Sequence, residues 1–229
     1  MWQAQIYFFA RRHSVICYDL LGHGQSPRIE GAATLDDFTR QLENLAAALD
    51  LKKFALVGFS FGGLIAQHFG TRCSRDLERL VLMSTVYDRS PSERQALRSR
   101  FEQALAKGPA SIYPAAIERW FSPAFLAGQP EQAQELHHRL LDNDDRSFLS
   151  TYEIFASADE ELAEKLSAIS CPTLMITGEH DTGSTPAMAW RMAKIIADAR
   201  VTIIPGGRHM MPMEMPQEVN SAIDRFLRG

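Results

Sequence analysis

Short apolar runs alternate with amphipathic stretches along most of the chain. The apolar runs predict buried strands at residues 15–18, 54–59, 80–83, 173–177 and 201–204. Apolar residues at helical spacing predict helices at residues 2–12, 35–49 and 61–72, from about 186, and at the end of the chain near Leu227. This alternation predicts an α/β fold with a mostly parallel sheet and helices on both of its faces.

The alternation stops between about residues 90 and 145. This segment is rich in polar residues, has a helical pattern and is broken by several prolines: Pro91, Pro109, Pro114, Pro123 and Pro130. An insertion of this size without a strand pattern predicts a helical cap over the sheet. We therefore expect a core domain in two parts, residues 1–89 and 151–229, with a helical cap at 90–150.

A G-x-S-x-G motif lies between a predicted strand and a predicted helix. The turn is so tight that side chains at Gly58 and Gly62 are expected to collide with it, and Ser60 is expected to be strained. Ser60 is thereby predicted to be an exposed nucleophile, and the Phe61 N–H is the expected oxyanion donor. The alternative is a small-residue turn without chemistry.

A serine hydroxyl needs a base before it acts as a nucleophile. Among seven histidines, His209 alone follows the last strand and precedes the final helix, at the sheet edge where such folds bind ligands. His209 is therefore the predicted base, against the alternative of an ordinary surface histidine.

The acid that orients the base should lie between the serine and the histidine in the chain. Asp181 follows the strand at 173–177 in a short loop and is the predicted acid, although a turn or capping aspartate fits the same pattern. Asp88, after the strand at 80–83, is the competing candidate. His180 is expected to be a bystander.

Composition favours a small-molecule substrate as the partner. The net charge is −4 with dispersed Lys and Arg, which argues against nucleic acid or an anionic membrane. No apolar run spans a bilayer and no secretory signal is evident, so a cytoplasmic location is expected. Cys17, Cys73 and Cys171 are expected to be buried reduced thiols. The sequence shows neither metal-ligand spacing nor a nucleotide-binding loop, so no metal and no cofactor are predicted.

The chain resembles the α/β-hydrolase superfamily over its whole length. The matching segments are residues 18–26, 58–63, 177–181 and 209–216. Within the superfamily it is most similar to the enol-lactonase and carbon–carbon bond hydrolase group, on residues 118–121 and 182–186. Dehalogenase or epoxide hydrolase chemistry needs an aspartate nucleophile, which Ser60 excludes.

The beginning of the chain departs from the family pattern. Family members begin with a hairpin and a third strand that leads into a His-Gly loop, the source of the second oxyanion N–H. Residues 1–5 resemble the helix after that loop, so about 30 residues of N-terminal strands are expected to be missing. His23-Gly24 is rejected as that loop because its flanks match the loop after the next strand. We therefore expect this chain to be a shortened form or a fragment of an active enzyme.

The predicted function is hydrolysis of a small carboxylic ester or lactone through an acyl-enzyme. Arg119, Trp120 and Met210 are the candidate substrate contacts. The alternatives are a solvated side chain for Arg119, packing within the cap for Trp120 and packing against the final helix for Met210. Phe121 and Phe125, like Trp120, are expected either to line an apolar pocket or to pack within the cap. Carbon–carbon bond hydrolysis of a diketone-type ring-fission product and a catalytically impaired binding module remain the alternative functions.

Overall fold

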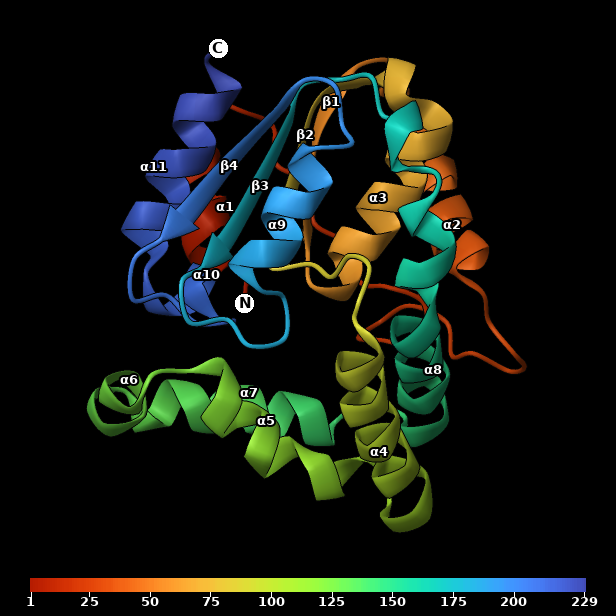
Figure 1. Ribbon diagram of the computed structural model, residues 1–229, viewed down its shortest axis with the longest axis vertical. Helices are drawn as coiled ribbons and strands as arrows, with labels where there is room; N and C mark the ends of the chain where they lie inside the picture. The colour runs from red at the N-terminus through yellow and green to blue at the C-terminus, as the bar shows by residue number, and fades with distance from the viewer.

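The sheet consists of four parallel strands. The computed structural model describes residues 1–229, and its strands are β1 (Phe54–Phe59), β2 (Leu77–Met83), β3 (Thr173–Gly178) and β4 (Ala199–Ile204). They pair in the order β1-β2-β3-β4, which confirms the strands predicted in these regions. Because all pairs are parallel, the carboxyl ends of the four strands meet at one edge of the sheet (Figure 1).

The strand predicted at residues 15–18 does not form, so this prediction is wrong. Residues 14–20 have no regular secondary structure, and Ile16 is 47% exposed. A strand needs a neighbour whose N–H and C=O groups complete its hydrogen bonds. The expected topology put another strand between this segment and β1, but β1 pairs only with β2.

The three cysteines are free thiols in different surroundings. Cys171 is buried, as predicted, and Cys73 is half-buried. Cys17 is exposed, so the prediction that it is buried is wrong. Cys17 lies in the same irregular segment, where residues 14–17 are all exposed.

Helices cover both faces of the sheet, as the sequence predicts (Figure 1). One face carries α2 (Leu35–Ala48), α3 (Phe61–Cys73) and α9 (Pro186–Ala193), and the other carries α1 (Gln3–Phe9), α10 (Met211–Glu214) and α11 (Pro216–Leu227). Residues of β2 alternate between the two layers: Leu80 and Leu82 pack with α2 and α3, whereas Val81 and Met83 pack with α11. Burial on both faces explains why this run is apolar throughout.

The helix α2 begins at Leu35, as predicted. The side chain of Thr34 accepts a hydrogen bond from the Asp37 N–H, and the Asp37 carboxylate accepts one from the Thr34 N–H. This reciprocal pair satisfies two N–H groups that the helix itself leaves free. The helix buries Phe38 and Leu42 against the core.

A separate layer of helices lies over the carboxyl edge of the sheet (Figure 1). It contains α4 (Pro91–Lys107), α5 (Tyr113–Trp120), α6 (Pro123–Gly128) and α7 (Pro130–Leu141), which we call the cap helices. Each of them has a proline in its first turn, where no N–H is needed. The prolines that interrupt the sequence pattern therefore begin helices.

The helix α8 (Asp145–Ala163) joins the cap helices to the core. Its first half packs Phe148 and Tyr152 against the cap, whereas Ile154 and Leu162 belong to the main core. The predicted end of the cap at residue 150 therefore falls inside a continuous helix. At 19 residues α8 is the longest helix, yet neither it nor any other helix has the length and apolar composition to cross a membrane.

Candidate active site

Ser60 stands at the turn between β1 and α3, as predicted. Its backbone has φ 53° and ψ −116°, a conformation that costs free energy for any residue with a Cβ atom. The Ser60 N–H donates to the Met83 carbonyl at 2.9 Å, which fixes the turn to the neighbouring strand. The turn therefore holds Ser60 at the carboxyl edge of the sheet.

The glycines around Ser60 have different roles. A Cβ atom on Gly58 would overlap the Gly62 carbonyl and come within 2.6 Å of the Ala66 Cβ, and one on Gly63 would overlap Thr85. A Cβ atom on Gly62 would meet nothing within 4 Å. The predicted collision is confirmed at Gly58 and wrong at Gly62, because α3 turns that position away from its neighbours.

These contacts predict opposite effects for two similar substitutions. Gly58→Ala forces the start of α3 away from β1, and we expect it to lower the free energy of unfolding by about 1–3 kcal/mol. Gly62→Ala adds a helix-favouring residue in open space and should raise it by about 0.5–1 kcal/mol. Urea unfolding of both variants measures the difference, and equal effects would contradict the steric explanation.

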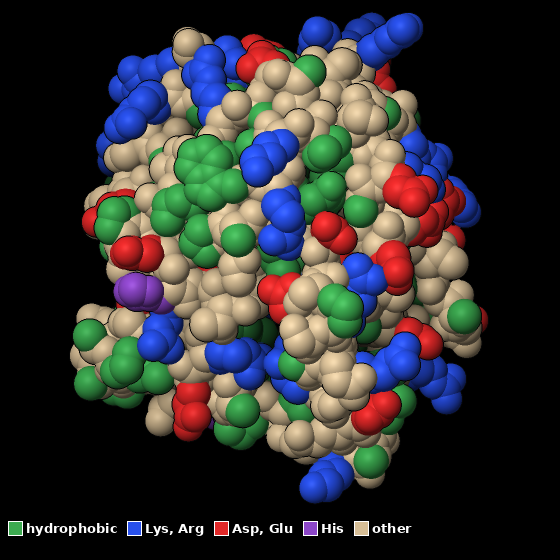
Figure 2. Space-filling view, in the orientation of Figure 1, with side chains coloured by type: hydrophobic (Ala, Val, Ile, Leu, Met, Phe, Trp, Pro, Cys, Tyr) green, Lys and Arg blue, Asp and Glu red, His purple; other side chains and the backbone are tan.

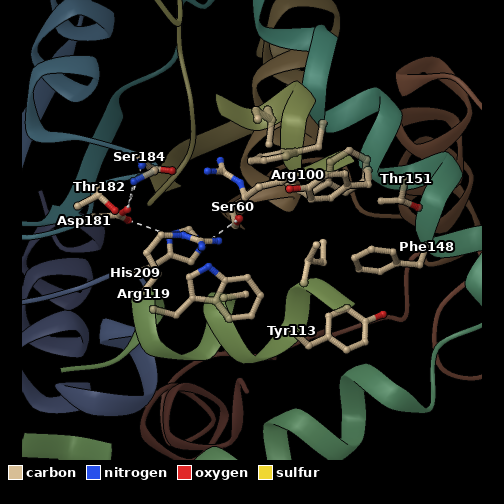
Figure 3. Close-up of a pocket in the computed structure, with 18 of the residues that line it drawn as sticks. Ser60, Arg100, Tyr113, Arg119, Phe148, Thr151, Asp181, Thr182, Ser184 and His209 are labelled. Atoms are coloured by element: carbon tan, nitrogen blue, oxygen red, sulfur yellow. Dashed lines mark hydrogen bonds and ion pairs between the residues drawn. The ribbon is translucent and has the colours of Figure 1, made fainter. Parts of the chain in front are cut away.

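His209 links Ser60 to Asp181. Its Nε2 lies 3.1 Å from Ser60 Oγ, and its Nδ1 lies 2.8 Å from Asp181 Oδ2 (Figure 3). Ser60 follows β1, Asp181 follows β3 and His209 follows β4, so the parallel sheet brings together three residues that are distant in the sequence. Because an ionised carboxylate only accepts hydrogen bonds, Nδ1 donates to Asp181 and Nε2 is left to accept the Ser60 proton.

Asp181 is buried, but hydrogen bonds from the protein stabilise its negative charge. Its Oδ1 accepts hydrogen bonds from the N–H groups of Gly183 at 3.0 Å and Ser184 at 2.9 Å. Burial by itself raises the pKa of Asp181, but the charge and hydrogen bond of His209 and the two N–H groups outweigh it, so the pKa lies below its ordinary value. Asp181 therefore stays ionised and keeps His209 in this orientation.

The other acid and histidine near these loops lie elsewhere. The Asp88 side chain is 53% exposed and faces Arg94 at 3.7 Å. His180 is exposed. Neither makes a hydrogen bond to His209, whose two ring nitrogens are occupied by Ser60 and Asp181.

The N–H of Phe61 is available beside the nucleophile. Phe61 is the first residue of α3, and the first N–H groups of a helix have no acceptor within the helix. The helix dipole adds partial positive charge there. This position can therefore donate a hydrogen bond to an oxygen that develops negative charge next to Ser60.

Ser60 and His209 open onto a cavity of about 250 Å³ between the core and the cap helices. Figure 2 shows the hollow between these two layers, with Lys and Arg side chains beside it. Its walls are largely apolar and aromatic, with Leu97, Tyr113 and Phe148 among them. A largely apolar hollow with a few polar groups is typical of a small-molecule site.

Two of the three predicted substrate contacts line this cavity. Arg119 and Trp120, both from α5, belong to its wall, and the Trp120 ring lies 5.8 Å from the His209 ring. Met210 does not line the cavity: it is buried, and its N–H donates to the Trp120 carbonyl at 3.0 Å. The geometry does not support a substrate contact for Met210, because the turn after His209 directs it into the packing under the cap.

Phe121 and Phe125 pack within the cap. Their rings stack with centroids 4.7 Å apart and planes at 6°, and neither residue lines the cavity. Of the two interpretations of these residues, packing is the one that the structure supports.

Several cavity residues were missed from the sequence. Arg100 on α4 and Thr151 and Tyr152 on α8 all line the cavity. Each lies in a polar helical stretch where every turn has similar residues, so the pattern does not show which face meets the site. His23, rejected above as part of an oxyanion loop, also lines the cavity, and its Nδ1 donates to the Leu21 carbonyl at 2.9 Å.

No group of three or more His, Cys, Asp or Glu side chains is arranged to hold a metal ion.

Comparison with known proteins identifies the family of the chain. The sequence pattern of the alpha/beta hydrolase family matches residues 1–222, and the chain belongs to this family, which confirms the resemblance and the fold class. Its relatives include the (E)-2-((N-methylformamido)methylene)succinate hydrolase of Acinetobacter baylyi, 32% identical over 99% of this chain and 84% of that protein. The 3-oxoadipate enol-lactonase 2 of the same organism is 28% identical over 100% of this chain and 84% of that protein.

Among solved structures, the enol-lactonase of Burkholderia xenovorans is similar, with a TM-score of 0.91 and 26% identity over 100% of this chain and 86% of that one. The relatives are hydrolases by name, which supports hydrolase activity for this chain.

Proposed function

We propose that this protein is a serine hydrolase that cleaves a small carboxylic ester or lactone through an acyl-enzyme. The observation that carries the proposal is the continuous hydrogen-bonded chain from Asp181 through His209 to Ser60, which ends in the cavity. A nucleophile, a base in contact with it and an acid that orients the base are the parts that such a reaction needs.

The first half of the reaction forms the acyl-enzyme. His209 Nε2 takes the Ser60 proton as Oγ attacks the ester carbonyl, and the oxygen that becomes negative accepts a hydrogen bond from the Phe61 N–H. When the carbon–oxygen bond breaks, His209 returns its proton to the leaving alkoxide. With a lactone, that alkoxide stays attached to the acyl group.

The second half releases the acid. His209 takes a proton from a water molecule, which attacks the acyl carbonyl and gives the carboxylic acid, and the proton then returns to Ser60 Oγ. Throughout both halves Asp181 stays ionised and stabilises the imidazolium form of His209.

Arg119 and Trp120 are the proposed substrate contacts from the cap. Both line the cavity near His209, and a guanidinium group suits a carboxylate. The relatives agree with a carboxylated substrate, since by name one hydrolyses a succinate derivative and another the enol-lactone of 3-oxoadipate.

Labelling with a neutral alkyl fluorophosphonate tests the proposal. The wild-type protein should form one covalent adduct on Ser60, located by mass spectrometry of the peptide, and Ser60→Ala should form none. His209→Gln should keep the fold, seen by circular dichroism, and lose labelling. Absence of labelling in the folded wild-type protein would contradict the enzymatic proposal and favour a binding module.

A further inference from the structure

The cavity holds a second arginine, Arg100, which comes from a different helix than Arg119. Arg100 is half-buried on α4, and its Nε is completely buried without a hydrogen-bond partner. No carboxylate lies within 4 Å of its guanidinium group. The neighbouring Arg89 and Arg94 also have a buried nitrogen without a hydrogen bond, but they differ in having acidic partners, Asp159 and Glu160 respectively.

Arg119 is in the same situation. Its only hydrogen bond goes from Nη1 to the Ala115 carbonyl at 3.1 Å, and it has no acidic partner. Burial and then the positive charge of Arg100 lower the pKa of Arg119. Two like charges thus share one partly buried space, an arrangement that costs free energy unless an anion enters.

The charge of Asp181 favours the charged form of Arg119 from a distance, but no acidic side chain forms an ion pair with Arg100 or Arg119. Asp181 is the only acidic residue in the lining, and both of its oxygens are already bound, one by His209 and the other by the N–H groups of Gly183 and Ser184. The space that a substrate enters is therefore positive, with two sets of free guanidinium donors (Figure 3).

We propose that Arg100 is a specificity-determining residue that binds, together with Arg119, a free carboxylate that the substrate carries in addition to its scissile ester or lactone. The substrate class is then the half-ester or lactone of a short dicarboxylic acid. The apolar wall formed by Leu97, Ile112 and Phe148 contacts its carbon chain. This inference rests on the proposed function, since it names the substrate of the same site.

The test compares monomethyl glutarate with methyl pentanoate, which has a similar chain but no charge. Each is measured for turnover in a pH-stat and for its ability to slow fluorophosphonate labelling of Ser60, which reports binding even without turnover. The wild-type protein should prefer monomethyl glutarate. Arg100→Gln should reduce binding and kcat/KM for it by about 10–100-fold, because hydrogen bonds to a charged group are lost.

Three control variants separate the proposed role from simpler explanations. Arg98→Gln removes the same charge from an exposed position on the same helix and should leave the preference unchanged. Arg100→Lys should retain part of it, and Arg119→Gln should lower it as Arg100→Gln does. Methyl pentanoate should bind Arg98→Gln as it binds the wild-type protein, and circular dichroism of every variant shows whether the fold is intact.

Several outcomes would overturn the inference. They are a wild-type protein without preference for the anionic ester, equal losses in Arg98→Gln and Arg100→Gln, and a loss in Arg100→Gln that is the same for both esters. These outcomes are distinct from failure of the proposed function, in which the wild-type protein is not labelled at Ser60 at all.

Discussion

Asp181→Asn is expected to lower kcat about 10⁴-fold while the fold stays intact. The amide oxygen of the new residue would face the N–H groups of Gly183 and Ser184, which now bind Asp181 Oδ1. Its NH₂ group would then face His209 and make Nδ1 the acceptor. The ring proton would move to Nε2, so His209 would present a donor to Ser60 and could not take its proton.

Ester turnover and the rate of fluorophosphonate labelling measure this loss, and nitrogen NMR of the histidine ring reports the tautomer. The matched control is Asp88→Asn, which changes the competing acid on the exposed loop after β2 and should leave activity unchanged. If Asp88→Asn lost activity and Asp181→Asn kept it, the roles assigned to the two acids would be wrong.

The positions of Ser60, Asp181 and His209 could be predicted because each follows a strand directly. In a parallel sheet the carboxyl ends of the strands share one edge, so a residue just past a strand has a known location without any knowledge of long-range packing. The short loops after β3 and β4 leave little freedom for where Asp181 and His209 lie.

Features that depend on a partner far away in the chain could not be predicted in this way. The run at residues 15–18 has the composition of a strand, but whether it forms one depends on a neighbour with which to pair. The sequence of α4 contains several arginines, and nothing in it distinguishes Arg100 from the others. Arg100 lines the cavity because of how α4 lies against α5 and α8. Gly62 fits the motif, yet its surroundings are set by how α3 leaves the turn.

The ion pair between Arg89 and Asp159 is expected to control stability more than any other charged contact. Arg89 lies just before α4 and Asp159 lies on α8, and their side chains are 4% and 0% exposed. Asp159 accepts from the Arg89 guanidinium at 2.6 Å and from the Arg89 N–H at 2.9 Å. The guanidinium also donates to the Phe155 carbonyl at 2.9 Å and lies over its ring.

Asp159→Asn should lower the free energy of unfolding by about 3–5 kcal/mol, because it leaves a buried guanidinium without its counter-charge. That is a large part of the total stability of a typical domain, about 5–15 kcal/mol. Burial, the largest influence on Arg89, lowers its pKa despite the attraction of Asp159, so loss of that attraction would disfavour the charged form further.

Urea unfolding followed by circular dichroism measures the change, with Glu161→Gln as the matched control. Glu161 lies on the same helix and pairs with Lys165, but its side chain is 76% exposed, so its loss should change stability by less than about 0.5 kcal/mol. Equal effects of the two substitutions would show that the buried pair adds no more than a surface pair. Since α4 and α8 both line the cavity, a destabilised Asp159→Asn protein should also bind the glutarate half-ester more weakly, which connects the packing of the two helices to substrate recognition.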